Sequence, residues 1–216
     1  MTHVREHRSI LAAAEKRLLI FIAERLPRFI NSDHLTSLAL AGMALAGAAF
    51  AAARWDRRAL WLVVIALAVN WFGDSLDGTL ARVRQQQRPR YGFYVDHMID
   101  SFGSLALMGG LALSGFMHPA IAIGLLVGFL MLSIQSYLAT YTMGEFHLSF
   151  WHFGPTELRV LLAVGNLALL WHPMVFHGQF RLFDVGGAIG LIGMAAMLIA
   201  VTAKNTVRLY CEERIR

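Results

Sequence analysis

Charged residues are scarce in this chain: Asp, Glu, Lys and Arg make up 15% of its 216 residues, and 57% are hydrophobic. A soluble domain of this size normally carries about 25% charged residues, so the composition argues against a soluble protein. Cysteine is scarcer still, because Cys211 stands alone and one cysteine cannot form an intramolecular disulfide. There is no internal repeat and no loop long enough for a soluble domain. We therefore predict a helical membrane protein, since isolated strands leave unsatisfied backbone groups in lipid.

Six segments contain the roughly 20 apolar residues that a membrane-spanning helix needs. They cover residues 34–53, 59–81, 92–116, 119–143, 155–173 and 184–208. Gly- and Ala-rich stretches at 39–53 and 103–115 would let helix backbones approach closely. The predicted fold class is an all-α integral membrane protein, with six transmembrane helices in one membrane domain over residues 31–216.

The first 30 residues form a separate segment because charge is mixed through them. Between 4 and 28, Lys and Arg alternate with apolar residues that recur at three- and four-residue steps, which predicts an amphipathic basic helix. A signal peptide would have a pure apolar stretch, so we expect no cleavable signal. We predict that residues 1–30 form a cytoplasmic juxtamembrane helix lying at the headgroups of an anionic leaflet. The alternative is a solvated helix packed on a neighbour.

The distribution of positive charge sets the predicted orientation. With the N-terminus inside, 15 of the 19 Lys and Arg residues fall on the inner side and four on the outer side. We therefore expect a multi-pass protein of the inner (cytoplasmic) membrane, with both termini and the active site on the cytoplasmic side. The net charge of +5 does not indicate a nucleic-acid partner, because the basic residues lie at the predicted inner face of the membrane.

Four aspartates stand out from this apolar background, within 27 residues. Asp74 and Asp77 are spaced i,i+3, and Asp96 and Asp100 are spaced i,i+4, so on helices each pair shares one face. An antiparallel helix pair would bring all four to a similar depth. Carboxylates that close stay ionised only where a cation neutralises them, and Mg²⁺ is held by carboxylates together with substrate phosphates. Helix-end pairing with the arginines at 82–90 is the alternative, but acids inside a membrane are usually functional.

The pattern D-x-x-D-G-x-x-A-R, then nine residues, then G-x-x-x-D-x-x-x-D resembles the signature of the CDP-alcohol phosphotransferase (CDP-alcohol phosphatidyltransferase) family. Every fixed position is filled: Asp74, Asp77, Gly78, Ala81, Arg82, Gly92, Asp96 and Asp100. The resemblance implies an integral membrane enzyme of phospholipid synthesis. It would move a substituted phosphate group from a CDP-alcohol to a second alcohol and release CMP.

The resemblance also implies roles for the aspartates. Asp74, Asp77 and Asp96 would hold a first Mg²⁺ or Mn²⁺ ion, and Asp74, Asp96 and Asp100 a second. Asp100 is the family's usual general base, which requires one carboxylate oxygen free to reach the acceptor hydroxyl. Metal ions would make the pyrophosphate more electrophilic and CMP a better leaving group.

Three motif residues are expected to contact the CDP substrate. Gly78 lacks a Cβ, so a nucleotide could lie against the backbone, although a helix-packing glycine is the alternative. Arg82 can fork onto a phosphate, and its alternative is a snorkelling arginine at the inner face. Gly92 is expected in the nucleotide pocket.

Upstream, residues 31–36 resemble the turn that enters the first span in this family, with Ser32 in place of the usual proline. Asp33 and Thr36 match that turn and are expected to help hold the cytidine or its phosphates. Asp33 could also act as the N-cap of the first span. His34 and His97 are expected to be a helix-start polar residue and a packing residue, rather than ligands.

The aromatic- and His-rich loop 144–157 bears on the identity of the substrates. Pro155 and Glu157 are typical of a helix start, but G-P-x-E also resembles, weakly, the aminoalcohol enzymes of the family. Its aromatic residues could hold a quaternary ammonium or form an interfacial belt. CDP-diacylglycerol with a small polar alcohol is favoured slightly over CDP-choline or CDP-ethanolamine with diacylglycerol. A divalent-cation transporter is a more distant alternative, since no second half carries matching acids. By analogy with the family, we expect a homodimer.

Overall fold

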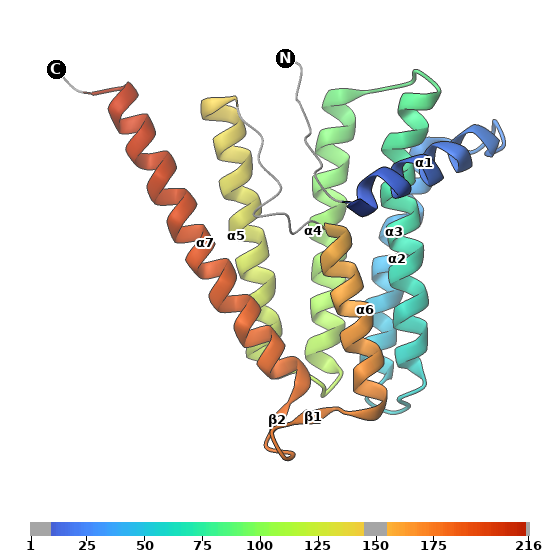
Figure 1. The fold of residues 1–216 in the computed structure, drawn as a ribbon, viewed down its shortest axis with the longest axis vertical. Helices are drawn as coiled ribbons and strands as arrows, with labels where there is room; N and C mark the ends of the chain where they lie inside the picture. The colour runs from blue at the N-terminus through green and yellow to red at the C-terminus, as the bar shows by residue number, and fades with distance from the viewer. Residues whose placement is uncertain (1–9, 145–154, 215–216) are drawn as a thin grey trace.

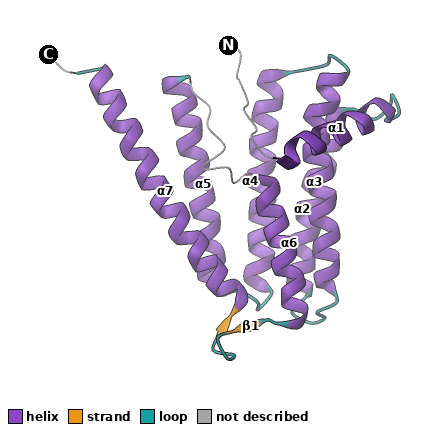
Figure 2. Cartoon of the chain, viewed as in Figure 1, coloured by secondary structure: helices purple, strands orange, loops and turns teal. Residues whose placement is uncertain are grey.

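The computed structural model describes residues 10–144 and 155–214, which form seven helices and one short hairpin. The elements are α1 (Ile10–Arg25), α2 (Ser32–Ala52), α3 (Ala59–Val83), α4 (Pro89–Leu113), α5 (Pro119–Met143), α6 (Pro155–Trp171), β1 (Met174–Val175), β2 (Phe180–Arg181) and α7 (Leu182–Glu212). The two-residue strands pair antiparallel and form the turn that leads from α6 into α7 (Figure 2).

The predicted all-α class is confirmed, and a helix occupies each of the six segments predicted to span the membrane. Four of them, α2, α3, α5 and α7, are long and apolar enough to cross a membrane by length and composition. The other two are α4, which carries the polar residues of the second half of the motif, and α6, which has 17 residues. The hairpin of β1 and β2 was not predicted.

The helices run up and down and separate into two groups (Figure 1). α2 packs along both α3 and α4, and α6 packs on α3. α5 packs on α4 and on α7, and α7 leans away from the rest of the bundle toward its C-terminal end. The α3–α4 connection and the C-terminal ends of α5 and α7 lie at one end of the bundle, and the hairpin lies at the other.

Glycines allow the closest helix contacts, as the Gly- and Ala-rich stretches predicted. A Cβ added at Gly42 on α2 would lie 2.8 Å from the backbone nitrogen of Asn70 on α3. A Cβ added at Gly110 on α4 would overlap the backbone of Gly47 on α2. Only glycine fits at these positions without moving a backbone, so α2 is held tightly between α3 and α4.

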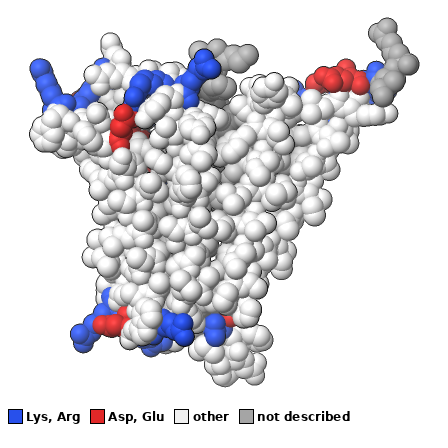
Figure 3. Space-filling view, turned by 180° about the vertical axis from the view of Figure 1, so that it is seen from behind, with Lys and Arg blue, Asp and Glu red and all other residues white. Residues whose placement is uncertain are grey.

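Charged side chains gather at the two ends of the molecule, with an uncharged belt between them (Figure 3). The connection of α2 to α3 carries Arg54, Arg57 and Arg58 at the hairpin end, and the connection of α3 to α4 carries arginines at the opposite end. An apolar belt between two charged rims is the surface that a bilayer requires.

α1 crosses the bundle near the end that holds the α3–α4 connection (Figure 1) and packs on α3. Its buried Leu19 and Ala23 form a small core with Leu76 and Leu80 of α3. The Trp71 indole N–H donates to a Glu15 carboxylate oxygen at 2.9 Å. The alternative of a helix packed on a neighbour therefore describes one face of α1. Leu18 and Phe21 remain exposed on it.

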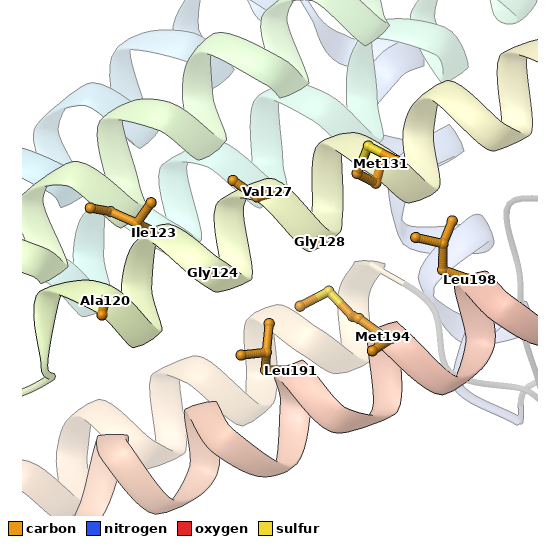
Figure 4. Close-up of a pocket in the computed structure, with 10 residues that line it drawn as sticks. Ala120, Ile123, Gly124, Val127, Gly128, Met131, Leu191, Met194 and Leu198 are labelled. Carbon is orange, nitrogen blue, oxygen red and sulfur yellow. The ribbon is translucent and has the colours of Figure 1, made fainter.

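The contact between α5 and α7 is looser than the glycine contacts of α2 with α3 and α4. A groove of about 570 Å³ separates them, lined only by apolar and glycine residues. Figure 4 shows Leu191 and Met194 of α7 reaching toward α5, where Gly124 and Gly128 leave room for them. Side chains rather than backbones make this contact.

Candidate active site

The two aspartate pairs lie on α3 and α4, as predicted. These helices run antiparallel and pack on α2, but they do not pack along each other's length. The chain reverses between them at 84–88, where Gln85 takes a positive φ of 56°. Pro89 then begins α4 at the first helical position, where no hydrogen bond within the helix requires the backbone N–H that proline lacks. α2 thus sets the spacing of the two aspartate-bearing helices.

The structure places Asp77 and Asp100 each within electrostatic reach of the other three motif aspartates. Asp77 interacts with Asp74 and Asp96, and Asp100 interacts with the other three. Asp77 is buried, with 8% of its surface exposed. Asp96 and Asp100 keep exposed surface, although Asp100 is surrounded by protein at longer range. The cluster therefore has a closed side at α2 and an open side along α4.

Asp77 is held from α2 and from its own helix. Thr36 Oγ1 donates to Asp77 Oδ2 at 2.7 Å, and the Gly78 N–H donates to Oδ1 at 2.5 Å. Ser32 Oγ donates to the Asp77 carbonyl at 2.9 Å. Ser32 is the residue that replaces the family's proline, and its hydroxyl makes a contact that a proline cannot make. Thr36, predicted to contact the substrate, contacts Asp77 instead, a contact that the sequence did not predict.

Asp74 pairs with a cation that the motif does not contain. Arg159 Nη2 on α6 donates to Asp74 Oδ2 at 2.8 Å, and Arg159 also interacts with Asp100. In the predicted topology Arg159 is only one of the positive charges on the inner face. Its position early in α6, a short apolar helix, was the available signal, because a charge there must find a partner.

The predicted substrate residues of α3 and α4 border the cluster. The Arg82 side chain passes over Gly78, with its Nη1 3.4 Å from where a Cβ would stand, and its Nη2 donates to Thr79 Oγ1 at 3.0 Å. Arg82 is exposed. A Cβ added at Gly92 would meet no heavy atom of the described residues within 4 Å, so packing against them does not require glycine there.

Asp33 does not cap α2, which corrects one alternative. Asn31 is the N-cap: its side chain accepts from the His34 N–H at 3.0 Å, and His34 Nδ1 accepts from the Asn31 N–H at 3.3 Å. This capping box leaves Asp33 in the first turn, where its carboxylate forms an ion pair with Arg88. Asp33 lies on the same helix end as Thr36. His34 is the helix-start residue that was predicted.

His97 packs between aromatic rings, as expected. Its ring centroid lies 4.2 Å from that of Phe93 on α4 and 4.9 Å from that of Tyr137 on α5. Tyr137 also lies within electrostatic reach of Asp100. The open side of the cluster therefore has an aromatic wall, of which sequence analysis named only His97.

Comparison with known proteins identifies the family. Residues 29–204 match the family described as CDP-alcohol phosphatidyltransferase, and the match covers most of the chain. The chain belongs to this family. No curated protein and no solved structure matches the chain.

Membership establishes the class of reaction. CDP-alcohol phosphatidyltransferases are membrane transferases of substituted phosphate groups in phospholipid synthesis, so the chain is such an enzyme and a multi-pass membrane protein. The family that the aspartate motif indicated is thereby confirmed. The loop at 145–154, which was to bear on the acceptor, lies outside the described residues, and α6 begins at Pro155 as predicted.

The family generally depends on divalent metal ions, and the donor set here suits them. The four aspartates offer hard carboxylate oxygens, which Mg²⁺ and Mn²⁺ prefer as ligands, and two of them, Asp96 and Asp100, keep exposed surface. Within residues 10–144 and 155–214, no three His, Cys, Asp or Glu side chains are drawn together as a ready-made ligand group. In this arrangement Asp74 faces Arg159 and Asp77 faces Thr36.

Proposed function

We propose that the protein transfers a phosphatidyl group from CDP-diacylglycerol to a small polar alcohol and releases CMP. The observation that carries the proposal is that α3 and α4 hold Asp74, Asp77, Asp96 and Asp100 close enough to interact electrostatically. A lipid donor suits a site built on helices of an apolar membrane bundle (Figure 3).

The four aspartates are proposed to hold two ions, Mg²⁺ or Mn²⁺. When bound, such ions stabilise negative charge on the pyrophosphate and on the departing CMP. The protein's part is to fix the carboxylates. The hydrogen bond from Thr36 orients Asp77, and the packing of α2 fixes the distance between the pairs.

The nucleotide is proposed to lie along the ends of α2, α3 and α4 where Gly78, Gly92 and Arg82 are found. The space around Gly92 supports this placement, as does the exposed guanidinium of Arg82. Asp33 and Thr36 belong to the same end of α2, with Thr36 acting through Asp77. Arg82→Lys is expected to raise KM for the CDP substrate, because an ammonium loses the fork geometry.

Asp100 is proposed as the general base. Its exposed surface on α4 supports access to an acceptor hydroxyl, and a base must reach the proton that it removes. The acceptor would then approach along the aromatic wall of Phe93, His97 and Tyr137. His97 is the next candidate for the base.

The arrangement in the membrane is proposed as follows. α2 to α7 are the six membrane helices of a domain over residues 31–216, and residues 1–30 form an interfacial segment through the exposed face of α1. The cluster and both termini face the cytoplasm, with the carboxylate end of the bundle on that side. The enzyme acts as a homodimer among membrane lipids, with no nucleic-acid partner.

The second candidate is an aminoalcohol phosphotransferase that joins CDP-choline or CDP-ethanolamine to diacylglycerol. The aromatic wall beside Asp100 favours it, because aromatic faces bind quaternary ammonium groups. It shares the carboxylate site and differs in which substrate is the lipid. Membership of a transferase family removes the reason to pursue the transporter alternative.

A donor and acceptor screen decides between the two. Purified protein in lipid vesicles would receive Mg²⁺ and either CDP-diacylglycerol with a panel of polar alcohols, or CDP-choline and CDP-ethanolamine with diacylglycerol. CMP release only with CDP-diacylglycerol and one alcohol would support the proposal. Release only in the aminoalcohol arm would replace it with the second candidate.

A further inference from the structure

Arg159 is a cation placed at the carboxylate cluster from outside the motif. Its Nη2 lies 2.8 Å from Asp74 Oδ2, and its side chain is 17% exposed, against 37% for Asp74. The two residues are 85 positions apart, and Arg159 also interacts with Asp100 on a third helix. The guanidinium is thus largely shielded from solvent, which weakens the screening that makes fully exposed ion pairs contribute little.

The helix α6 holds this guanidinium at a definite place. α6 begins part-way along the bundle rather than at its end, and it packs on α3 (Figure 1). About two turns beyond Arg159, the fully buried Asn166 donates its Nδ2 to the Leu60 carbonyl of α3 at 2.7 Å. The arginine therefore projects from a helix anchored to α3, and not from the connecting loop.

Arg159 and a divalent ion would compete for Asp74. Arginine stays protonated at every physiological pH, so its charge cannot be removed to make way for the ion. A divalent cation on the same carboxylates repels the guanidinium, a repulsion that the neutral hydroxyl of Thr36 at Asp77 does not produce. The ion and Arg159 therefore weaken each other's hold on Asp74. A displaced guanidinium needs a new anionic partner, and a diphosphate offers oxygens in the geometry that its fork matches.

We infer that Arg159 is the resting counter-ion of the aspartate cluster. It neutralises Asp74 while no ion is bound, and it moves to the diphosphate of the CDP-alcohol when ions occupy the carboxylates. Arg159 is thus a positioning residue. When the metal ion binds Asp74, Arg159 loses its anionic partner, and the diphosphate of the donor replaces it. Metal and donor therefore bind cooperatively. This inference rests on the proposed function, since it needs metal at the aspartates.

Direct titration with Mn²⁺ tests the inference without relying on turnover. Full-length wild type and Arg159→Gln, in detergent, are titrated with Mn²⁺ while the free ion is followed by electron paramagnetic resonance, with and without cytidine diphosphate. We expect Mn²⁺ alone to bind Arg159→Gln about tenfold more tightly, as loss of one charge-assisted competitor implies. Cytidine diphosphate should then increase Mn²⁺ affinity less in the variant than in wild type. Arg181→Gln, at the opposite end of the bundle, is the matched control and should behave as wild type.

The outcomes separate this inference from the proposed function. If Arg159→Gln binds Mn²⁺ no more tightly than wild type, the counter-ion role is wrong while the metal site stands. If wild type and variants bind no Mn²⁺ even with cytidine diphosphate, the metal site and the inference both fail. Should Arg159→Gln not fold, Arg159→Lys replaces it. Lysine lacks the forked guanidinium, so Mn²⁺ should still bind more tightly than to wild type. Unchanged or weaker Mn²⁺ binding overturns the counter-ion role.

Discussion

The helices that carry the aspartates and the pair formed by α5 and α7 are held together in different ways. Between α2 and α4, glycine lets backbone lie against backbone, so that a Cβ at Gly47 would overlap the Ala106 carbonyl. Between α5 and α7, a Cβ at Gly128 would lie 3.3 Å from the flexible end of the Met194 side chain. One contact is set by main-chain geometry, and the other can adjust.

Burial and polar contacts follow the same division. In the apolar stretches of α2 and α3, 44% and 39% of the 18 residues are buried within the protein, against 11% and 6% in those of α5 and α7. Asn70 Nδ2 also joins α3 to α2 by donating to the Ala39 carbonyl at 3.0 Å. Metal sites need ligands held to within about 0.5 Å. The chain has its carboxylates on the part of the bundle where helix spacing is least adjustable.

The largest expected effect comes from Asp96→Asn in the close-packed part. We expect CMP release to fall by at least about 10³-fold, because loss of a shared ligand removes several kcal/mol of charge stabilisation. EDTA should abolish release in the wild type, and added Mg²⁺ should restore it. The control is Asp184→Asn on α7, whose carboxylate accepts from the His118 N–H at 2.5 Å, far from the cluster; it should keep its rate. Near-wild-type turnover of Asp96→Asn would refute the shared-ligand role.

Asp100→Asn should separate the base from the ligands. Turnover should fall by about 10²–10⁴-fold, the usual contribution of a general base. Affinity for a CDP ligand with Mg²⁺ should fall less, since three aspartates remain. Calorimetric titration beside a CMP-release assay measures both on one preparation. If binding disappears together with turnover, Asp100 is primarily a ligand and His97 becomes the candidate base.

Gly110→Ala tests the backbone contact itself. We expect a loss of about 1–3 kcal/mol or more in unfolding free energy, because the new methyl group must push α4 away from α2. Gly109→Ala is the neighbouring control, as its Cβ would meet no atom within 4 Å in the part of the chain that the structure describes. Gly128→Ala on α5 should also be mild. Thermal melting followed by circular dichroism ranks the three, and equal melting temperatures for Gly110→Ala and Gly128→Ala would remove the contrast between the two parts.

Among the substitutions at the site, the smallest expected effect is that of Thr36→Val, which removes one hydrogen bond to Asp77. A hydrogen bond to a charged group contributes about 1.5–3 kcal/mol, so we expect Mn²⁺ affinity to fall by roughly ten- to a hundredfold. Thr36→Ser should restore most of it. Thr142→Val on α5, where the hydroxyl donates to the Leu138 carbonyl at 2.8 Å, is the matched control. An unchanged Mn²⁺ affinity in Thr36→Val would return Thr36 to the substrate-binding role that its sequence position suggested.

Helix positions and the composition of the site were predictable from the sequence because both depend on short-range periodicity. Apolar length located each helix of the bundle, and i,i+3 and i,i+4 spacing placed each aspartate pair on one face. The capping residue of α2 could not be predicted from the sequence. Asn31 and Asp33 can both cap a helix, and the choice between them depends on where the first turn closes.

The partners of the aspartates were decided only in three dimensions. Thr36 lies 41 residues from Asp77, and Arg159 lies 85 residues from Asp74. Neither separation leaves a periodic trace in the sequence, because a contact between helices depends on how each is rotated and how deeply it is set. The sequence alone determined a helical membrane transferase with four aspartates on two helices. The packing of α2 and α6 determined that a threonine orients one of those carboxylates and an arginine neutralises another.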